Sequence, residues 1–278
     1  VGYQAGYTNT TGTNITALGY QAAYANTADS TTAVGTFALT ANTSGVRNTA
    51  LGYASLYTNT TGGYNVAIGQ EALRLNTTAS YNTAVGYQAG FTNTTGDVCA
   101  FGMKALYSNT TGIGNTALGG YAGGTGLYAA LQLNTTGSYN TAFGDQALFS
   151  NTSAGSNTAM GYQAGYSNTT GSENTFLGKD AGYFNTTSSG NTEVGYQAGH
   201  RTTGANNTLV GYQAGYSNTT GNFNFASGCQ ALFCNKTGSN NFAVGGYGLV
   251  AIDNQSVAGL TISTASDTTN NYIHIDSF

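Results

Sequence analysis

Glycine recurs at a nearly fixed interval along almost the whole chain, and this periodicity limits the fold more than any other feature. Consecutive marker glycines are 16 or 17 residues apart, with one gap of 25; they are Gly2, Gly19, Gly35, Gly52, Gly69, Gly86, Gly102, Gly119, Gly144, Gly161, Gly178, Gly195, Gly211, Gly228 and Gly245. Self-similarity at a fixed period is typical of proteins built from stacked repeats. The sequence therefore predicts an all-β parallel β-solenoid (a β-roll) of about 15 coils with 16–17 residues per coil.

The repeats share one consensus: Asn-Thr-Ala-Leu-Gly-Tyr-Gln-Ala-Gly-Tyr-Ser-Asn-Thr-Thr-Gly, followed by two variable residues. We number these positions 1 to 17, so that Asn157 occupies position 1, Gly161 position 5 and Gly171 position 15. Gly, Thr, Asn and Tyr dominate, and the apolar residues lack a sustained helical spacing, which argues against helices. We expect one strand at positions 2–6, a second strand following positions 7–11, and a turn at Asn-Thr-Thr-Gly.

Position 4 is apolar in nearly every repeat, and in a solenoid the equivalent residues of successive coils lie above one another, about 4.8 Å apart. We therefore expect position 4 to form a stacked hydrophobic core. Its candidate residues are Leu51, Ile68, Val85, Leu118, Phe143, Met160, Leu177, Val194 and Val210.

Two further repeat positions predict side chains that stack from coil to coil. Position 10 is mostly aromatic and predicts a stack of rings: Tyr7, Tyr57, Phe91, Tyr107, Phe149, Tyr166, Tyr183 and Tyr216. Position 12 predicts a ladder of side-chain amides that pass hydrogen bonds from coil to coil: Asn59, Asn76, Asn93, Asn109, Asn151, Asn168, Asn185 and Asn218.

Positions 6 and 9 vary together in most repeats. Tyr162 accompanies the small Gly165, whereas Asp145 accompanies the larger Leu148. At interior packing density such a correlation indicates compensation of volume between two side chains in contact.

Composition excludes several classes of partner and activity. Only 6% of residues are charged and the net charge is −4, against about 25% charged in typical soluble domains. Nucleic acid is excluded because its phosphates need clustered Lys and Arg. No apolar stretch is long enough for a transmembrane helix, so no membrane insertion is expected. The chain begins within a repeat at Val1, which indicates a piece of a longer polypeptide.

The sequence offers no catalytic or metal site, and no cofactor is expected. His200 and His274 are far apart, and the carboxylates occur singly, without the pairing that glycoside hydrolysis requires. Cys229 and Cys234 share one coil and leave two interpretations, a disulfide or small apolar substitutes. Asn-x-Thr/Ser triplets in nearly every coil are interpreted as turn structure rather than as glycosylation sites.

We divide the chain into a β-solenoid repeat domain (residues 1–245) and a terminal cap or junction to a following domain (246–278). The 25-residue gap contains an insert at 120–133, which is either a binding loop or a tolerated surface bulge. In the cap, 256–263 and 271–276 are expected to be strands.

Asn157-Thr-Ala-Met-Gly161 and Asn65-Val-Ala-Ile-Gly69 resemble the Asn-Ser-x-Ala-Ile-Gly repeat of trimeric autotransporter adhesin heads (Hep/Hag type). Related arrays occur in phage tail fibres and bacterial surface proteins. The resemblance covers about residues 1–250, although the period here is longer than is usual in adhesin heads. It implies a left-handed parallel β-roll, three chains side by side, and a stiff adhesive fibre. It transfers no ligand-binding residue.

The leading interpretation is a non-enzymatic structural or adhesive fibre, a tail-fibre or surface-appendage shaft at the cell surface, outside the cell or on a virion. Its expected partners are copies of itself, as a homotrimer or an end-to-end assembly, and a cell-surface glycan or receptor. An ice-binding protein that uses a Thr/Ser-Asn-Thr ladder, such as Thr58-Asn59-Thr60, is the second interpretation. A self-assembling extracellular filament or sheath subunit is the third. All three share one fold.

Overall fold

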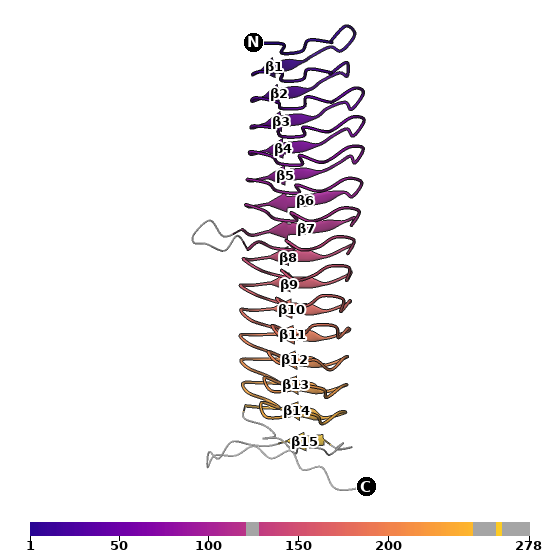
Figure 1. The fold of residues 1–278 in the computed structure, drawn as a ribbon. Helices are drawn as coiled ribbons and strands as arrows, with labels where there is room; N and C mark the ends of the chain where they lie inside the picture. Colours follow the sequence, from indigo (N-terminus) through magenta and orange to yellow (C-terminus); the bar gives the residue numbers. More distant parts are fainter. Residues whose placement is uncertain (121–127, 247–259, 263–278) are drawn as a thin grey trace.

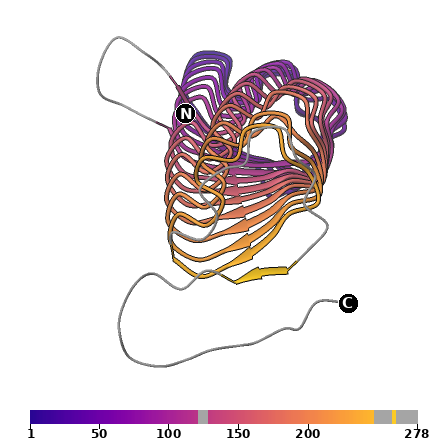
Figure 2. The same cartoon turned by 90° about the horizontal axis from the view of Figure 1, so that it is seen from below.

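The computed structural model describes residues 1–120, 128–246 and 260–262. These residues form a rod of stacked coils, shown from the side in Figure 1 and along the rod axis in Figure 2, and no helix occurs among them. Parallel strands follow one another in chain order in one 15-stranded sheet. The predicted all-β parallel solenoid is thereby confirmed. The strands are β1 (Thr16–Leu18), β2 (Thr32–Val34), β3 (Thr49–Leu51), β4 (Val66–Ile68), β5 (Thr83–Val85), β6 (Val98–Phe101), β7 (Asn115–Leu118), β8 (Thr141–Phe143), β9 (Thr158–Met160), β10 (Thr175–Leu177), β11 (Thr192–Val194), β12 (Thr208–Val210), β13 (Phe225–Ser227), β14 (Phe242–Val244) and β15 (Leu260–Ile262).

Each described coil contributes one strand, so the expected second strand is wrong. Positions 7 and 9 take left-handed backbone conformations, as in Gln163 (φ 57°) and Gly165 (φ 62°), and the chain bends there instead of extending. The bent segments still bond from coil to coil: the N–H of Gly165 donates to the carbonyl of Ala181 at 2.8 Å. Backbone groups outside the sheet are therefore paired without strand geometry.

Equivalent positions of successive coils do lie above one another, since Leu51 pairs with Ile68 and Ile68 with Val85 in the strand register. The prediction that this column forms the core is nevertheless wrong. Its side chains lie on the outer face of the sheet: Leu51, Leu118, Phe143, Met160 and Val210 are exposed, and Ile68, Val85, Leu177 and Val194 are half-buried.

The interior is lined instead by alanine at positions 3 and 8 and by leucine at position 9. Ala50, Ala67 and Ala84 are fully buried in the strands, and Leu56 and Leu73 are fully buried opposite them. Side chains alternate between the two faces of a strand, so an inward position 3 sends positions 2 and 4 outward. A coil of this length encloses a narrow interior, and alanine fits against the strand where leucine would not.

Volume compensation exists, but its partners are positions 3 and 9 rather than 6 and 9. The position 6 side chain of Tyr162 is 45% exposed, so it cannot fill interior space. Where position 9 is glycine in consecutive coils, position 3 is enlarged: Phe176 lies beside Gly165 and Gly182, Glu193 beside Gly199, and Leu209 beside Gly215.

The predicted insert is shorter than 120–133. Ala129, Ala130 and Leu131 are fully buried, and the N–H of Leu131 donates to the carbonyl of Ala147 at 3.0 Å, as position 9 does in other coils. The regular coil therefore resumes before Leu133, and residues 121–127 lie outside the described residues. Of the cap at 246–278, only Gly246 and β15 are described, with β15 paired to β14; the strand expected at 271–276 lies outside the described residues.

Candidate binding faces

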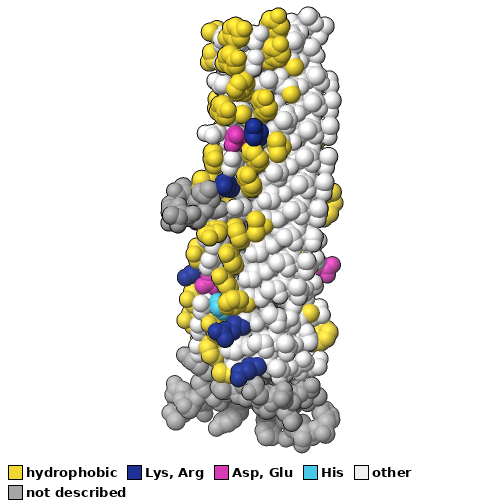
Figure 3. Space-filling view, in the orientation of Figure 1, with side chains coloured by type: hydrophobic (Ala, Val, Ile, Leu, Met, Phe, Trp, Pro, Cys, Tyr) yellow, Lys and Arg dark blue, Asp and Glu magenta, His cyan; other side chains and the backbone are white. Residues whose placement is uncertain are grey.

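The outer face of the sheet is a continuous, uncharged surface. Glu193 is the only charged residue in the fifteen described strands, and its side chain points inward. Along the rod this face presents the position 4 column, in which Leu51, Phe143 and Met160 are 45%, 49% and 46% exposed. Figure 3 shows another side of the rod, on which hydrophobic side chains form bands with Lys, Arg and His side chains among them, beside a broad face that is almost free of charge.

Threonine at position 2 forms a second column on the same outer face. Among the described residues, none of these threonine hydroxyls takes part in a hydrogen bond within the chain. The strand pairing places them directly above one another, as in Thr158↔Thr175 and Thr175↔Thr192. The column is Thr16, Thr32, Thr49, Thr83, Thr116, Thr141, Thr158, Thr175, Thr192 and Thr208. Its hydroxyls are therefore available to water or to a partner.

The position 10 aromatic residues stack along one corner of the rod. The longest run comprises Phe149, Tyr166, Tyr183, His200, Tyr216 and Phe233, with ring centroids 4.9–5.4 Å apart. Shorter stacks join Tyr7 to Tyr24 and Phe91 to Tyr107, at 5.4 and 5.1 Å. Tyr57 stacks on no ring of its own column; the Arg74 guanidinium lies 5.7 Å from its centroid and 5.7 Å from that of Phe91.

A further row of tyrosines and amides accompanies this corner. Tyr196 and Tyr212, at position 6, stack at 5.2 Å, and their neighbours at position 7 form a chain of side-chain amides. Gln213 Nε2 donates to Gln197 Oε1, and Gln230 Nε2 to Gln213 Oε1, both at 2.9 Å. Each of these side-chain amides donates one N–H to the neighbouring glutamine, and its second N–H can donate to an external acceptor.

The position 12 asparagines form a buried amide ladder over much of the rod. Nδ2 of Asn76 donates to Asn59 Oδ1 at 2.7 Å, Asn109 to Asn93 at 2.8 Å, and Asn168 to Asn151 at 3.2 Å. The link from Asn93 to Asn76 is longer, at 3.5 Å. Asn185 and Asn218 are buried in the same column, but neither donates to the preceding coil; each donates to a carbonyl of its own turn.

Sequence reasoning missed a second buried ladder, at position 1. There the side-chain oxygen of one asparagine accepts the backbone N–H of the next: Asn82 N donates to Asn65 Oδ1, and Asn174 N to Asn157 Oδ1, both at 2.9 Å. The signal was present, because position 1 is as regularly asparagine as position 12. At Val98 the column lacks an amide, yet the Val98 N–H still donates to Asn82 Oδ1 at 2.8 Å.

Burial of the position 12 column bears on two sequence features. The position 12 asparagines that begin an Asn-x-Thr/Ser triplet are buried from Asn42 to Asn235, and in the folded rod no glycan has room on their amide nitrogens. Asn206, which begins the triplet Asn206-Asn207-Thr208 outside this column, is exposed. In the triplet Thr58-Asn59-Thr60 the hydroxyls are also engaged: Thr58 donates to the Arg74 carbonyl at 2.8 Å and Thr60 to the Thr77 carbonyl at 3.0 Å. These residues therefore serve the fold.

Titratable groups are scattered over the described part of the chain, where no group of three His, Cys, Asp or Glu is placed to hold a metal ion. Cys99, Cys229 and Cys234 are all free thiols. Burial lowers the pKa of His200, so this imidazole is neutral at pH 7 in its ring stack. No described helix is long and apolar enough to cross a membrane.

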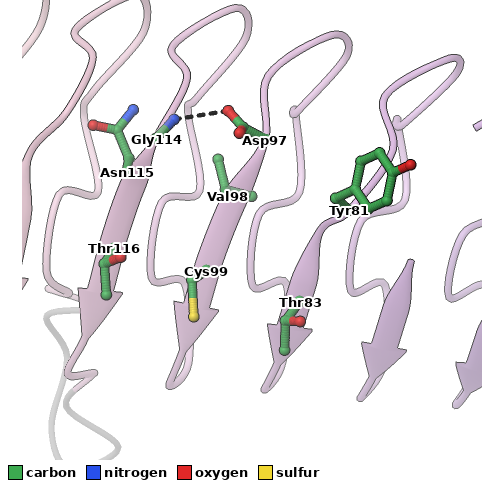
Figure 4. A pocket seen from close by; sticks show the side chains of 8 residues that line it. All are labelled: Tyr81, Thr83, Asp97, Val98, Cys99, Gly114, Asn115 and Thr116. Carbon is green, nitrogen blue, oxygen red and sulfur yellow. Dashed lines mark hydrogen bonds between the residues drawn. The ribbon is translucent and has the colours of Figure 1, made fainter. Parts of the chain in front are cut away.

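A surface hollow of about 210 Å³ lies over β5–β7 and is shown in Figure 4. It opens beside Tyr81 and Gly114, and Asp97 Oδ1 accepts the backbone N–H of Gly114 at 2.7 Å. Cys99 and Thr116 line its other side. Burial raises the pKa of the Cys99 thiol.

No family model matches the chain, and no curated protein or solved structure matches it either.

Proposed function

We propose that the chain is a non-enzymatic structural or adhesive fibre, the shaft of a tail fibre or surface appendage, whose copies associate side by side through the outer face of the sheet. The supporting observation is the exposed position 4 column, which runs from Leu18 to Val244. An exposed apolar surface of this length is typical of an interaction site.

A second copy of the chain is the occupant that the face fits best. Another rod has the same axial repeat, so each coil meets an equivalent coil along the whole contact. Because positions 2 and 4 carry no charge, identical faces approach without like-charge repulsion. In the assembled fibre the tyrosine and glutamine rows at positions 6, 7 and 10 supply hydroxyls, amides and ring edges for a sugar-bearing surface. Many weak contacts of this kind add up through multivalency.

Charge on the outer face provides the test. We expect the wild-type chain to sediment as a side-by-side oligomer, a trimer in the leading proposal, and Leu118→Lys combined with Phe143→Lys to give a monomer, because association would bury two ammonium groups unpaired. The control is Thr111→Lys, an exposed residue outside the strands, which should leave the oligomer intact. Native mass spectrometry and sedimentation velocity measure the oligomeric state. A wild-type chain that is monomeric at every concentration contradicts the proposal. An open polymer favours the filament alternative.

The position 2 threonine column favours ice binding as a second candidate function. A column of hydroxyls without hydrogen bonds inside the chain, beside a mainly apolar column, can order water into a regular array; here Val66 and Cys99 interrupt the hydroxyls. For this candidate function we propose an ice-binding surface on β1–β12, rather than at triplets such as Thr58-Asn59-Thr60, whose asparagine is buried.

Removal of hydroxyls separates the two functions. For an ice-binding chain we expect measurable thermal hysteresis that Thr141→Val, Thr158→Val and Thr175→Val together abolish, since valine keeps the shape and removes the hydroxyl. The same variant should still form the fibre oligomer, because the apolar column is unchanged. Absence of hysteresis in the wild type rejects ice binding and leaves the fibre proposal standing.

A further inference from the structure

The coil from Asn191 to Asn206 interrupts two features of the rod interior, the apolar core and the position 12 amide ladder. The buried apolar residues fall into two separate clusters, one whose last member is Ala181 and a second that begins at Leu209. Glu193, fully buried, occupies the strand position between them, where most coils have alanine. The apolar interior is therefore discontinuous at this point.

The position 12 amide ladder is broken at the same place. Asn168 Oδ1 is buried without a hydrogen-bond partner, and Asn185 donates to the Ser188 carbonyl at 3.1 Å instead of to Asn168. In the next coil Thr202 replaces asparagine, and its buried hydroxyl has no hydrogen bond of ordinary geometry. Asn218 donates only to the Gly221 carbonyl, so three consecutive coil-to-coil links are absent here. Asn151, by contrast, donates to Asn134 at 2.8 Å.

Glu193 fits the interior because its neighbours at position 9 are glycines. A Cβ added to Gly199 would lie 2.1 Å from the Glu193 Cδ, and one added to Gly182 would lie 2.6 Å from Oε2. Both carboxyl oxygens are buried without a hydrogen bond of ordinary geometry. A buried carboxylate without a charged partner is strongly unfavourable, so the group is held in its neutral form.

No charged side chain faces this carboxyl from the packed segments. Its partners in the strand register are Phe176 on β10 and Leu209 on β12, and the opposite corner contributes Gly182, Gly199 and the Thr202 hydroxyl. The charged and titratable groups of the adjoining corner segments include Asp180 and Lys179, which face each other at 3.9 Å, and His200 with Arg201. The causes of the shifted Glu193 pKa are its burial and the Thr202 hydroxyl, and none of these four groups is among them.

We propose that the coil from Asn191 to Asn206 is a pH-sensitive weak joint, at which the rod opens locally when Glu193 ionises. In a stacked-repeat protein each coil contacts only its neighbours, so one coil can open while the segments on either side stay folded. The joint divides the shaft into a long segment and a short segment next to the C-terminal cap region.

The direction of the pH effect follows from the burial of this group. Burial raises the pKa of Glu193 well above its ordinary value of 4.5, and the Thr202 hydroxyl offsets only part of this effect. The folded coil keeps a proton that the opened coil releases above about pH 4.5. The stabilising effect of that proton is complete below this pH and is lost as the pH rises toward the folded pKa. Through that window the opening equilibrium rises about tenfold per pH unit, as one proton requires.

Native-state hydrogen exchange resolved by coil tests the joint. After correction for intrinsic exchange rates, amides from Thr192 to Leu209 should be less protected than equivalent amides from Thr141 to Thr158, with protection falling about tenfold per pH unit above pH 4.5. Glu193→Gln should remove the pH dependence while leaving the joint weak. Glu193→Leu places a leucine beside the position 9 glycines, as Leu209 lies beside Gly215, and should raise the protection of the amides in the joint.

Glu173→Gln provides the matched control, since Glu173 is exposed and the same substitution there should leave the exchange pattern unchanged. Equal protection in the two segments would overturn the proposal. So would a pH dependence that persists in Glu193→Gln, or one that Glu173→Gln removes. Because the wild-type protein alone reports the position and slope of the effect, the test does not depend on the folding of any variant.

Discussion

Gly161→Ala is expected to destabilise the rod by about 2–6 kcal/mol, the sum of backbone strain and steric overlap. The φ of Gly161 is 133°, a conformation that residues with a Cβ rarely adopt, and an added Cβ would lie 2.6 Å from the Gly178 carbonyl oxygen of the next coil. The carbonyl belongs to the backbone and cannot move aside without shifting its coil. The midpoint of urea unfolding and coil-resolved hydrogen exchange measure the effect, which should centre on β9 and β10.

Gly90→Ala is the matched control. Gly90, at position 9, has a φ of 58°, and an added Cβ would meet the flexible Leu73 side chain at 3.0 Å. Ala23 already occupies position 9 in another coil with a φ of 51°. We expect this substitution to cost about 1–2 kcal/mol, the ordinary cost of a left-handed residue with a Cβ. Equal losses for Gly161→Ala and Gly90→Ala would contradict the close stacking of the marker glycines.

The marker glycines explain why the architecture was predictable from the sequence. At the marker position each coil's backbone lies directly against the next, so this residue must be glycine in every coil. The result is a strict glycine period in the sequence. That period specifies the stacking, the parallel pairing and the register of Leu51 with Ile68. The ring contacts of Tyr166 with Tyr183 and the amide link of Asn76 to Asn59 follow from the same register. All of these depend only on the alignment of equivalent positions.

The sequence did not reveal which columns point inward. Hydrophobicity favoured Leu51 and Val85 as core, yet alternation along a three-residue strand permits either face, and the choice depends on the width of the interior. That width is set by the left-handed corners at positions 7 and 9, where Gln163 and Leu148 adopt positive φ values of 57° and 50°. Non-glycine residues in this conformation leave no sequence signal, so the narrow interior that selects alanine was not foreseeable.

The two buried asparagine columns contribute to the stability of the rod in addition to the burial of apolar surface. The rod has a thin apolar interior, made largely of alanine, and each alanine buries little surface. The two asparagine columns lie next to each other at the turn, where Asn42 Nδ2 and Asn48 Nδ2 both donate to the Gly45 carbonyl. Their paired amides turn buried polar groups into coil-to-coil connections. The same pairing makes each amide costly to remove, because its loss leaves several buried partners unsatisfied at once.

Asn109→Asp tests this ladder with an almost isosteric change. Asn109 Nδ2 donates to Asn93 Oδ1 at 2.8 Å and to the Gly112 carbonyl at 3.0 Å, and its Oδ1 accepts from Asn134 Nδ2 at 2.8 Å. The substitution removes both donors and points a buried carboxylate at two acceptor oxygens. We expect a loss of about 3–5 kcal/mol at pH 7, measured by urea unfolding.

The pH dependence of this loss identifies its cause. Burial and the facing oxygens raise the pKa of the introduced carboxyl in the folded state above its unfolded value of about 3.9. The folded variant then holds a proton that the unfolded chain releases, so the defect is smallest below about pH 4 and grows as the pH rises toward the folded pKa. Asn206→Asp, at an exposed corner with a φ of 59°, should show neither the loss nor its pH dependence. A pH-independent loss at position 109 would mean that geometry alone, and not a buried charge, weakens the ladder.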